Sequence, residues 1–242
     1  MEFTWEDATG EAEYRYEFAF TPGGGLPVAV TSGLPADTTS WSTDPLGCGG
    51  EGSFTIVALA GDGSEIGRLT VNFTTPACET VVLSPVGSLT GDLSSAGCSS
   101  PIRAGIAPAG NGIRAVVSFD IEDLNDASRI VSAYLDLSDY SLDGNPFEFL
   151  HPLHVDQVEY SHRCDYPDAF EGGLITSLAE ISAATPGLDN PIDVTAALSD
   201  HLASDTPHYF QIRLWFDGDD SGGAFASMAE WSTVTLTVEY EP

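Results

Sequence analysis

Short runs of strand-forming residues recur along the whole chain and predict β-strands. In Tyr14–Phe20 the aromatic residues occupy every second position, so one face of this strand is expected to be buried. Comparable runs occupy residues 53–59, 68–73, 113–120, 130–138, 153–160, 209–216 and 232–240. Turns such as Gly61–Ser64 separate the runs. The pattern predicts an all-β chain built from sandwiches.

Two segments in the C-terminal half depart from this pattern. Residues 174–184 are compatible with a short helix. Residues 192–202 predict a short amphipathic helix that Asp193 or Thr195 caps. We therefore expect a short helix in an otherwise all-β second half.

The N-terminal strands follow an order that is found in a known family. The pieces are Phe3–Asp7, Tyr14–Phe20, the approach Leu34–Trp41, Phe54–Ala60 with its hairpin turn, and Arg68–Phe73. In this order, residues 1–78 resemble a fibronectin type III domain, an immunoglobulin-like sandwich, with Trp5 in its core. The resemblance places the strands beside Cys48 and Cys78 next to each other, which makes a disulfide between them geometrically reasonable.

The same resemblance implies that the first strand of the sandwich is missing. A sandwich without one strand exposes main-chain donors and acceptors along an edge, and this invites pairing with another chain. Two explanations stay open. Either the sequence is cut inside a longer protein, or a neighbouring subunit donates the strand in a filament.

Residues 79–108 are rich in Ser, Gly, Pro and Ala, and predict a linker or a leading strand that starts near Thr80. The rest of the chain, residues 109–242, forms a second predicted unit. Its pieces are Arg114–Asp120, Ile130–Leu137, Asp193–Leu198, Phe210–Leu214 and Thr235–Tyr240. In this order they resemble the DNRLRE-type domains, which are jelly-roll-like sandwiches of secreted bacterial proteins related to carbohydrate-binding modules.

Charge excludes several classes of partner. The chain has 37 acidic residues, seven arginines and no lysine, with a formal net charge of −30. Nucleic acids and anionic membrane surfaces attract proteins through positive charge, so neither is expected as a partner. No apolar run approaches the length of about 20 residues that spans a bilayer, so we expect no membrane insertion.

The four cysteines bear on the compartment. No two cysteines are spaced as C-x-x-C, which argues against a structural zinc site; the four are Cys48, Cys78, Cys98 and Cys164. Two disulfides in an extracellular or cell-surface protein are expected, with Cys98 and Cys164 as the second pair. The alternative is four buried thiols in a reducing compartment. No secretion signal precedes the first strand, so Met1 is interpreted as the start of a mature or excised fragment.

Acidic loops and aromatic residues are the candidate binding groups. Asp217, Asp219 and Asp220 lie on one glycine-rich loop and could hold Ca²⁺, although solvated turns have the same composition. Otherwise no cofactor is expected. Trp231 and Tyr166 are candidate platforms for a sugar ring. Trp5 and Trp215 lie within strand patterns and are assigned to cores. The histidines around residue 154 are assigned to strand ends rather than to a metal site.

These observations predict a binding protein rather than an enzyme. The chain has no G-x-S-x-G, H-E-x-x-H or phosphate-loop motif, and pairs of carboxylates are uninformative in so acidic a sequence. We expect an extracellular, non-catalytic binding or adhesion module for polysaccharide or cell-surface glycan. The alternative is a structural subunit of an extracellular filament or surface layer, in which copies of the chain assemble by β-strand complementation.

Overall fold

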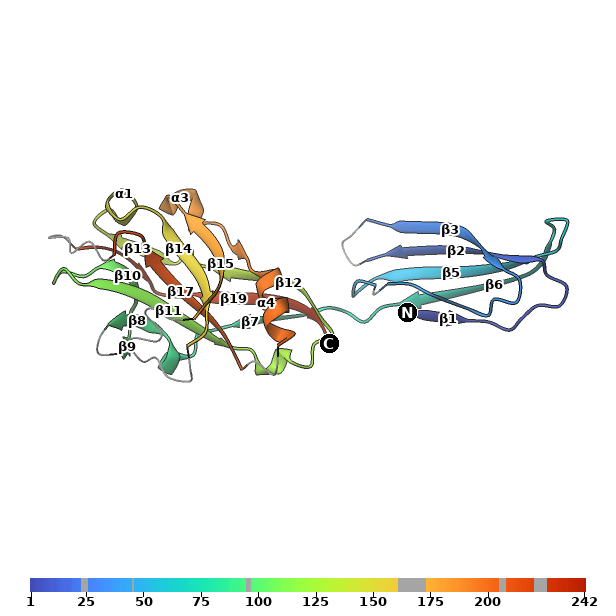
Figure 1. The fold of residues 1–242 in the computed structure, drawn as a ribbon, viewed down its shortest axis with the longest axis horizontal. Coiled ribbons are helices and arrows are strands. Elements are labelled where there is room, and N and C mark those ends of the chain that lie inside the picture. The colour runs from blue at the N-terminus through green and yellow to red at the C-terminus, as the bar shows by residue number, and fades with distance from the viewer. Residues whose placement is uncertain (23–25, 45, 95–96, 161–172, 205–207, 220–225) are drawn as a thin grey trace. The chain divides into compact units, whose positions relative to one another are not determined.

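The chain divides into two compact units, residues 1–79 and 80–240, which are considered separately (Figure 1). The computed structural model describes residues 1–242 except 23–25, 45, 95–96, 161–172, 205–207 and 220–225. In both units the described secondary structure is dominated by antiparallel strands, and the few short helices among the described residues lie in the second unit. The predicted all-β sandwich fold is therefore confirmed.

The first unit pairs a four-stranded sheet with a two-stranded one. The larger sheet has the order β3-β2-β5-β6, and the smaller one is β1-β4. Their bounds are β1 (Glu2–Thr4), β2 (Glu13–Thr21), β3 (Val28–Pro35), β4 (Ser40–Ser42), β5 (Glu51–Leu59) and β6 (Glu65–Thr74). The alternation predicted for β2 is present, because Tyr14, Tyr16, Phe18 and Phe20 all point into the core.

A disulfide closes one end of this unit. Cys48 precedes β5 and Cys78 follows β6, and the two are bonded with a Cα–Cα distance of 5.2 Å. The predicted Cys48–Cys78 pair is therefore confirmed. Cys98 is also disulfide-bonded, whereas Cys164, its expected partner, lies outside the described residues.

The second unit packs a nine-stranded sheet against a four-stranded one. The larger sheet runs β13-β18-β10-β11-β17-β14-β15, with β8 paired to β11 and β9 paired to β8; the smaller runs β16-β12-β19-β7. The strands are β7 (Glu79–Leu83), β8 (Gly91–Ser94), β9 (Gly97–Ser99), β10 (Ile102–Ile106), β11 (Gly112–Asp120), β12 (Arg129–Asp136), β13 (Tyr140–Asp143), β14 (Leu153–Val158), β15 (Leu174–Ile181), β16 (Ile192–Asp193), β17 (Tyr209–Phe216), β18 (Ser227–Trp231) and β19 (Thr235–Glu241). The helices are α1 (Pro146–Phe149), α3 (Ala184–Gly187) and α4 (Thr195–Leu202), with 3-10 turns at Gly87–Leu89 and Glu122–Leu124. One apolar core, which includes Phe119, Phe210 and Trp231, fills the space between the two sheets.

Two expectations about local structure were wrong, one of them in part. The leading strand expected near Thr80 is present as β7, which pairs with β19, but the rest of residues 79–108 is not a linker, because it contains β8, β9 and β10, and β10 pairs with β18. Residues 174–181 form strand β15 instead of a helix, because β14 supplies a ladder partner for them. The helix predicted near Asp193 is present as α4, but its predicted cap was wrong, because Val194 occupies the N-cap position and makes no side-chain cap hydrogen bond. The carboxylate of Asp193 instead accepts from the N–H of Thr195, the first residue of α4. Composition favoured a loop and a helix, and long-range pairing overrode both tendencies.

Candidate functional site

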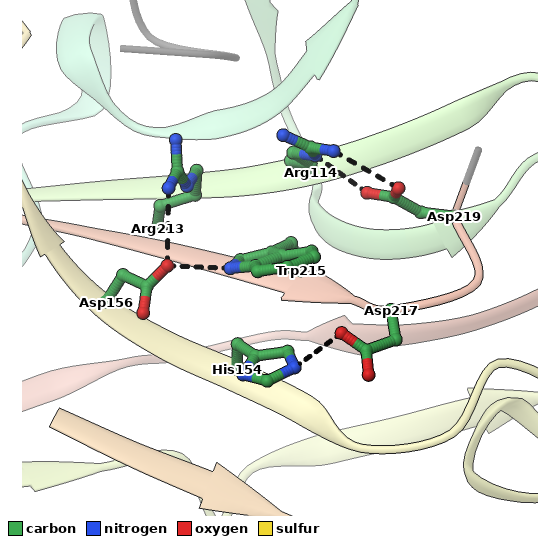
Figure 2. Close-up of polar contacts among 7 residues, drawn as sticks. All are labelled: Arg114, His154, Asp156, Arg213, Trp215, Asp217 and Asp219. Carbon is green, nitrogen blue, oxygen red and sulfur yellow. Dashed lines mark hydrogen bonds and ion pairs between the residues drawn. The ribbon is translucent and has the colours of Figure 1, made fainter. Parts of the chain in front are cut away.

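Three side chains lie in a row on the outer face of the nine-stranded sheet. Trp215 on β17 is directly opposite His154 on β14, and their rings stack with centroids 4.4 Å apart at 21°. The guanidinium carbon of Arg114 on β11 lies 5.1 Å from the indole centroid. Figure 2 shows the indole between the guanidinium and the imidazole. Strand neighbours such as Ala115, Val155 and Leu214 point into the core, and alternation therefore turns this row outward.

Carboxylates pair with each member of this row (Figure 2). Nε and a terminal nitrogen of Arg114 donate to the two carboxylate oxygens of Asp219, at 2.7 and 3.2 Å. Nε2 of His154 is hydrogen-bonded to Oδ1 of Asp217 at 2.7 Å. The indole of Trp215 donates to Asp156, which also accepts from Arg213. We call these seven residues the polar ladder.

The polar ladder satisfies its own charges and leaves little for a ligand. The carboxylate of Asp219 is 1% exposed and that of Asp156 is 5% exposed. His154 and Arg114 contact the indole of Trp215, so a sugar ring cannot stack on these covered faces. The ladder is therefore a rigid support for the sheet surface. The assignment of Trp215 to the core was wrong, because this side chain is only half-buried, on the outer face.

The predicted Ca²⁺ loop is not assembled in the described residues. Asp219 is buried with both carboxylate oxygens bonded to Arg114, while Asp217 is half-exposed and turns to His154. Asp220 lies outside the described residues. Ca²⁺ requires six to eight converging oxygens, and Asp217 and Asp219 are bonded to different side chains, His154 and Arg114. Sequence proximity alone suggested convergence, and bonding to residues on different strands separates the two carboxylates.

The two predicted sugar platforms have different outcomes. Trp231 is 1% exposed and its indole donates to the Leu137 carbonyl, so it is a core residue and cannot present a face to a ligand. The expectation for Trp231 was wrong, because β18 lies between β10 and β13 with this side chain turned inward. Tyr166 lies outside the described residues.

A cleft lies where α4 approaches the ends of β14, β15 and β17. Its volume is about 1250 Å³. Polar groups line it from several elements, and they include Glu159, Asp193, Asp200, His201, His208 and Tyr209. Apolar contact comes from Ile175 and Leu178 of β15. We call this the α4 cleft, and sequence reasoning did not find it because its residues come from segments far apart in the chain.

The wall of the α4 cleft is held by hydrogen bonds. Nε2 of His201 donates to the Tyr209 carbonyl at 2.8 Å, which ties the end of α4 to β17. The hydroxyl and N–H of Thr195 hold the pKa of Asp193 below its usual range. The side-chain oxygen of Thr195 in turn accepts from the N–H of Ala133 on β12 at 2.9 Å. The start of α4, where the sequence predicted a cap, is therefore fixed to the smaller sheet.

A buried phenol lies behind the same cleft. The hydroxyl of Tyr160 donates to the Leu89 carbonyl at 2.8 Å, and its ring packs with Leu93, Val116 and Val158 on the outer face of the sheet. Burial raises the pKa of Tyr160 well above its usual value. The residue is neutral at physiological pH and contributes shape rather than charge to the cleft.

Three acidic residues meet in the first unit. Ligand oxygens of Asp7, Glu11 and Asp37 lie within 4.8 Å of one another. Asp7 also accepts a hydrogen bond from the hydroxyl of Tyr14 at 2.9 Å. Three carboxylates are half or fewer of the ligands that Ca²⁺ takes, and solvated acidic groups share this geometry. This cluster was not anticipated, since Asp37 is far from the other two in sequence.

The chain was compared with known proteins. No protein-family model matches it, and no curated protein matches it. Among solved structures, it is similar to a β-porphyranase of glycoside hydrolase family 86 from the human gut bacterium Bacteroides plebeius, with 12% identity and a TM-score of 0.30. The match covers 97% of this chain and 31% of that enzyme, so the chain spans less than a third of its length. A TM-score this low carries no inference about activity.

Proposed function

We propose that the chain is a non-catalytic binding module whose second unit holds an uncharged polysaccharide in the α4 cleft. The observation that carries this proposal is the chemistry of the cleft. Its described lining contains no arginine, while it offers the carboxylates of Glu159, Asp193 and Asp200. Carboxylates accept hydrogen bonds, and sugar hydroxyls donate them. Anionic ligands would be repelled, because the whole chain carries −30.

The other groups of the cleft suit a sugar as well. Tyr209 is half-buried and combines an aromatic ring with a hydroxyl, and His208 is exposed beside it. Ligand sites combine apolar and aromatic walls with a few convergent polar groups, and this cleft has that mixture. The polar ladder supports the neighbouring part of the sheet and keeps β14 and β17 in register.

Two further features support the wider setting. The Cys48–Cys78 disulfide supports an extracellular or cell-surface location, where disulfides persist. Among the described residues, no helix is long and apolar enough to cross a membrane. The strand order of the first unit supports its likeness to fibronectin type III domains, and the two packed sheets of the second support its likeness to a DNRLRE-type sandwich.

Binding and catalysis are tested together. The intact protein is passed over insoluble polysaccharides and a glycan array, and the eluate is assayed for new reducing ends. The proposal expects retention on at least one uncharged polysaccharide without release of reducing ends. Absence of retention throughout the panel would remove the binding role, and release of reducing ends would show an enzyme.

Substitutions then locate the site. Asp200→Ala, at an exposed position of α4, and Tyr209→Ala are each expected to weaken binding by roughly tenfold, which corresponds to about 1.4 kcal/mol. Asp143→Ala is the matched control, since Asp143 is an exposed acidic residue of β13 outside the cleft. Equal loss in Asp143→Ala and Asp200→Ala would show that binding depends on net charge and not on the α4 cleft.

A further inference from the structure

The smaller sheet of the first unit leaves part of the larger sheet uncovered. Trp41 of β4 contacts Tyr16 and Phe18 of β2, and Phe3 of β1 stacks on Phe54 of β5 at 4.4 Å. β4 therefore lies over β2, and β1 lies over β5. Phe3 also reaches one end of β6, but in the described residues no third strand continues the β4-β1 layer over β6.

Two apolar side chains of β6 point into this uncovered layer. Val71 is opposite Phe54 and Leu69 is opposite Ile56 in the β5–β6 ladder. Directly opposed residues of an antiparallel pair share a face, so all four point toward the smaller sheet. Phe54 and Ile56 are buried, whereas Leu69 is 48% exposed and Val71 is 41% exposed. Inward-facing apolar residues that remain half-exposed mark an incomplete layer.

The edge of β1 beside this layer has main-chain groups that β4 does not use. The N–H of Trp5 donates to the Thr39 carbonyl at 3.0 Å, on the β4 side. Bonding alternates along an antiparallel pair, so Phe3 also faces β4, while the N–H and C=O groups of Glu2 and Thr4 point away. Among the described residues β1 pairs with β4 alone. An exposed edge of this kind is a template for strand addition.

We propose that this edge receives an extended strand from a second polypeptide. The incoming strand would continue the β4-β1 sheet, bond to the main chain of Glu2 and Thr4, and cover Leu69 and Val71 with its inward side chains. In such strand addition the main-chain bonds supply affinity, and the pockets for alternate side chains supply specificity. The proposal does not depend on glycan binding by the second unit.

Charge determines the chemistry of the incoming strand. Glu2 and Glu6 are exposed at this edge, and outward-facing residues of the new strand would lie beside them. Opposite charges across neighbouring strands stabilise a sheet, and like charges destabilise it. The partner strand therefore alternates Val or Ile with Arg or Lys. A second copy of this chain is disfavoured as the donor, because the chain has no lysine and a net charge of −30.

A peptide titration tests the partner chemistry on the intact protein. The probe is a labelled peptide of about seven residues that alternates Val and Arg. Two control peptides are used: one groups the same Val and Arg residues into blocks, and the other replaces Arg with Glu. The alternating Val–Arg peptide is expected to bind at least roughly tenfold more tightly than either control. Hydrogen exchange should slow at the amides of Glu2 and Thr4, and equal affinity for all three peptides would overturn the proposal.

Matched variants locate the contact. Val71→Lys is expected to abolish binding of the peptide, whereas Val30→Lys should leave it unchanged. Val30 is the suitable control because it is also inward-facing, opposite Phe18, and is 42% exposed, but it lies on the opposite edge of the sheet in β3. Thr4→Pro removes one edge donor and should weaken binding, while Thr4→Val keeps that donor and should not.

Other outcomes contradict the assignment. Equal loss in Val30→Lys and Val71→Lys would show general hydrophobic or charge effects instead of a docking edge. Light scattering without peptide serves as a second measurement. Concentration-dependent self-association that Val71→Lys abolishes would identify a second copy of the chain as the occupant and overturn the basic-strand partner. Where a longer form of the protein carries residues before Met1, loss of peptide binding in that form would identify the chain's own upstream segment as the occupant and would also overturn it.

Discussion

Oδ2 of Asp156 accepts a hydrogen bond from Nε1 of Trp215 at 2.7 Å, across the neighbouring strands β14 and β17. The same oxygen lies 3.2 Å from a guanidinium nitrogen of Arg213, which is directly opposite Asp156 in the ladder. Asp156 and Arg213 are 4% and 6% exposed. One buried carboxylate therefore orients both the cation and the indole around which the rest of the polar ladder is arranged.

Removal of this carboxylate should destabilise the second unit strongly. Asp156→Ala removes one charge partner of the buried guanidinium of Arg213, and breaking a buried pair in this way costs about 3–5 kcal/mol. Urea unfolding, followed by tryptophan fluorescence, measures the loss. The double variant Asp156→Leu with Arg213→Met should be less destabilised than Asp156→Ala, because it removes both charges of this pair. A double variant as unstable as the single one would contradict this account.

The Cys48–Cys78 disulfide should stabilise the first unit selectively. It closes a loop with a sequence separation of 30 residues, for which loop-closure entropy gives about 3–4 kcal/mol. The variant with Cys48→Ser and Cys78→Ser avoids reduction of the disulfide at Cys98. Hydrogen exchange should show lower protection in β2 and β5 and unchanged protection in β11 and β17. Equal loss in both units would show that this disulfide stabilises more than the first sandwich.

High pH should destabilise the second unit through Tyr160. Burial raises the pKa of Tyr160 in the folded state above its unfolded value of about 10, so the folded state binds its proton more tightly. The resulting stability is fully present below about pH 10 and is lost as the pH rises through the folded-state pKa. Tyr160→Phe should be less stable near neutrality by about 1 kcal/mol, because the bond to Leu89 is lost. Above about pH 10, urea unfolding should show a smaller further loss of unfolding free energy in Tyr160→Phe than in the wild-type protein. If the unfolding free energy falls equally steeply with pH in both proteins, Tyr160 is excluded as the cause.

Low pH should act on the start of α4. The hydroxyl and N–H of Thr195 lower the pKa of Asp193, so this contribution to stability is present above about pH 4 and is lost as the pH falls through the folded-state pKa. Thr195→Val removes the hydroxyl and should raise the pKa of Asp193, measured by NMR titration of its carboxylate. Thr195→Ser retains the hydroxyl and should preserve the lowered pKa. A normal pKa in Thr195→Ser would mean that the methyl group of Thr195, and not its hydroxyl, maintains the geometry.

Several parts of the fold could be predicted because their signal is local. Aromatic residues at every second position of Tyr14–Phe20 predicted β2 and its buried face, and the Asp193–Thr195 pair predicted the start of α4. The helix prediction for residues 174–181 was wrong because a short run of Leu, Ile, Thr and Ser is compatible with either a helix or a strand. Only pairing with β14 decides between the two. For the same reason, a composition rich in Ser and Gly did not reveal strands β8 and β9.

The site residues were harder to predict than the strands. Trp231 and Trp215 both lie in segments whose sequence pattern predicts a strand. Trp231 is nevertheless buried in the core, whereas Trp215 is half-buried on the outer face of the sheet. Burial of an indole depends on which layer covers its strand, and this is a long-range property. Asp217 and Asp219 are close in sequence but turn to His154 and Arg114, which lie on different strands.

The amino-acid sequence by itself determined the all-β class, most strands, the short helix α4 and the strongly acidic character of the chain. Alternation, turn residues and net charge are local or additive properties. Only the tertiary structure decided which carboxylates pair with which cations, which tryptophan is buried, and where the α4 cleft and the open edge of β1 lie. These features arise when strands distant in the chain become neighbours, and a side chain's partners and exposure depend on that neighbourhood rather than on its own segment.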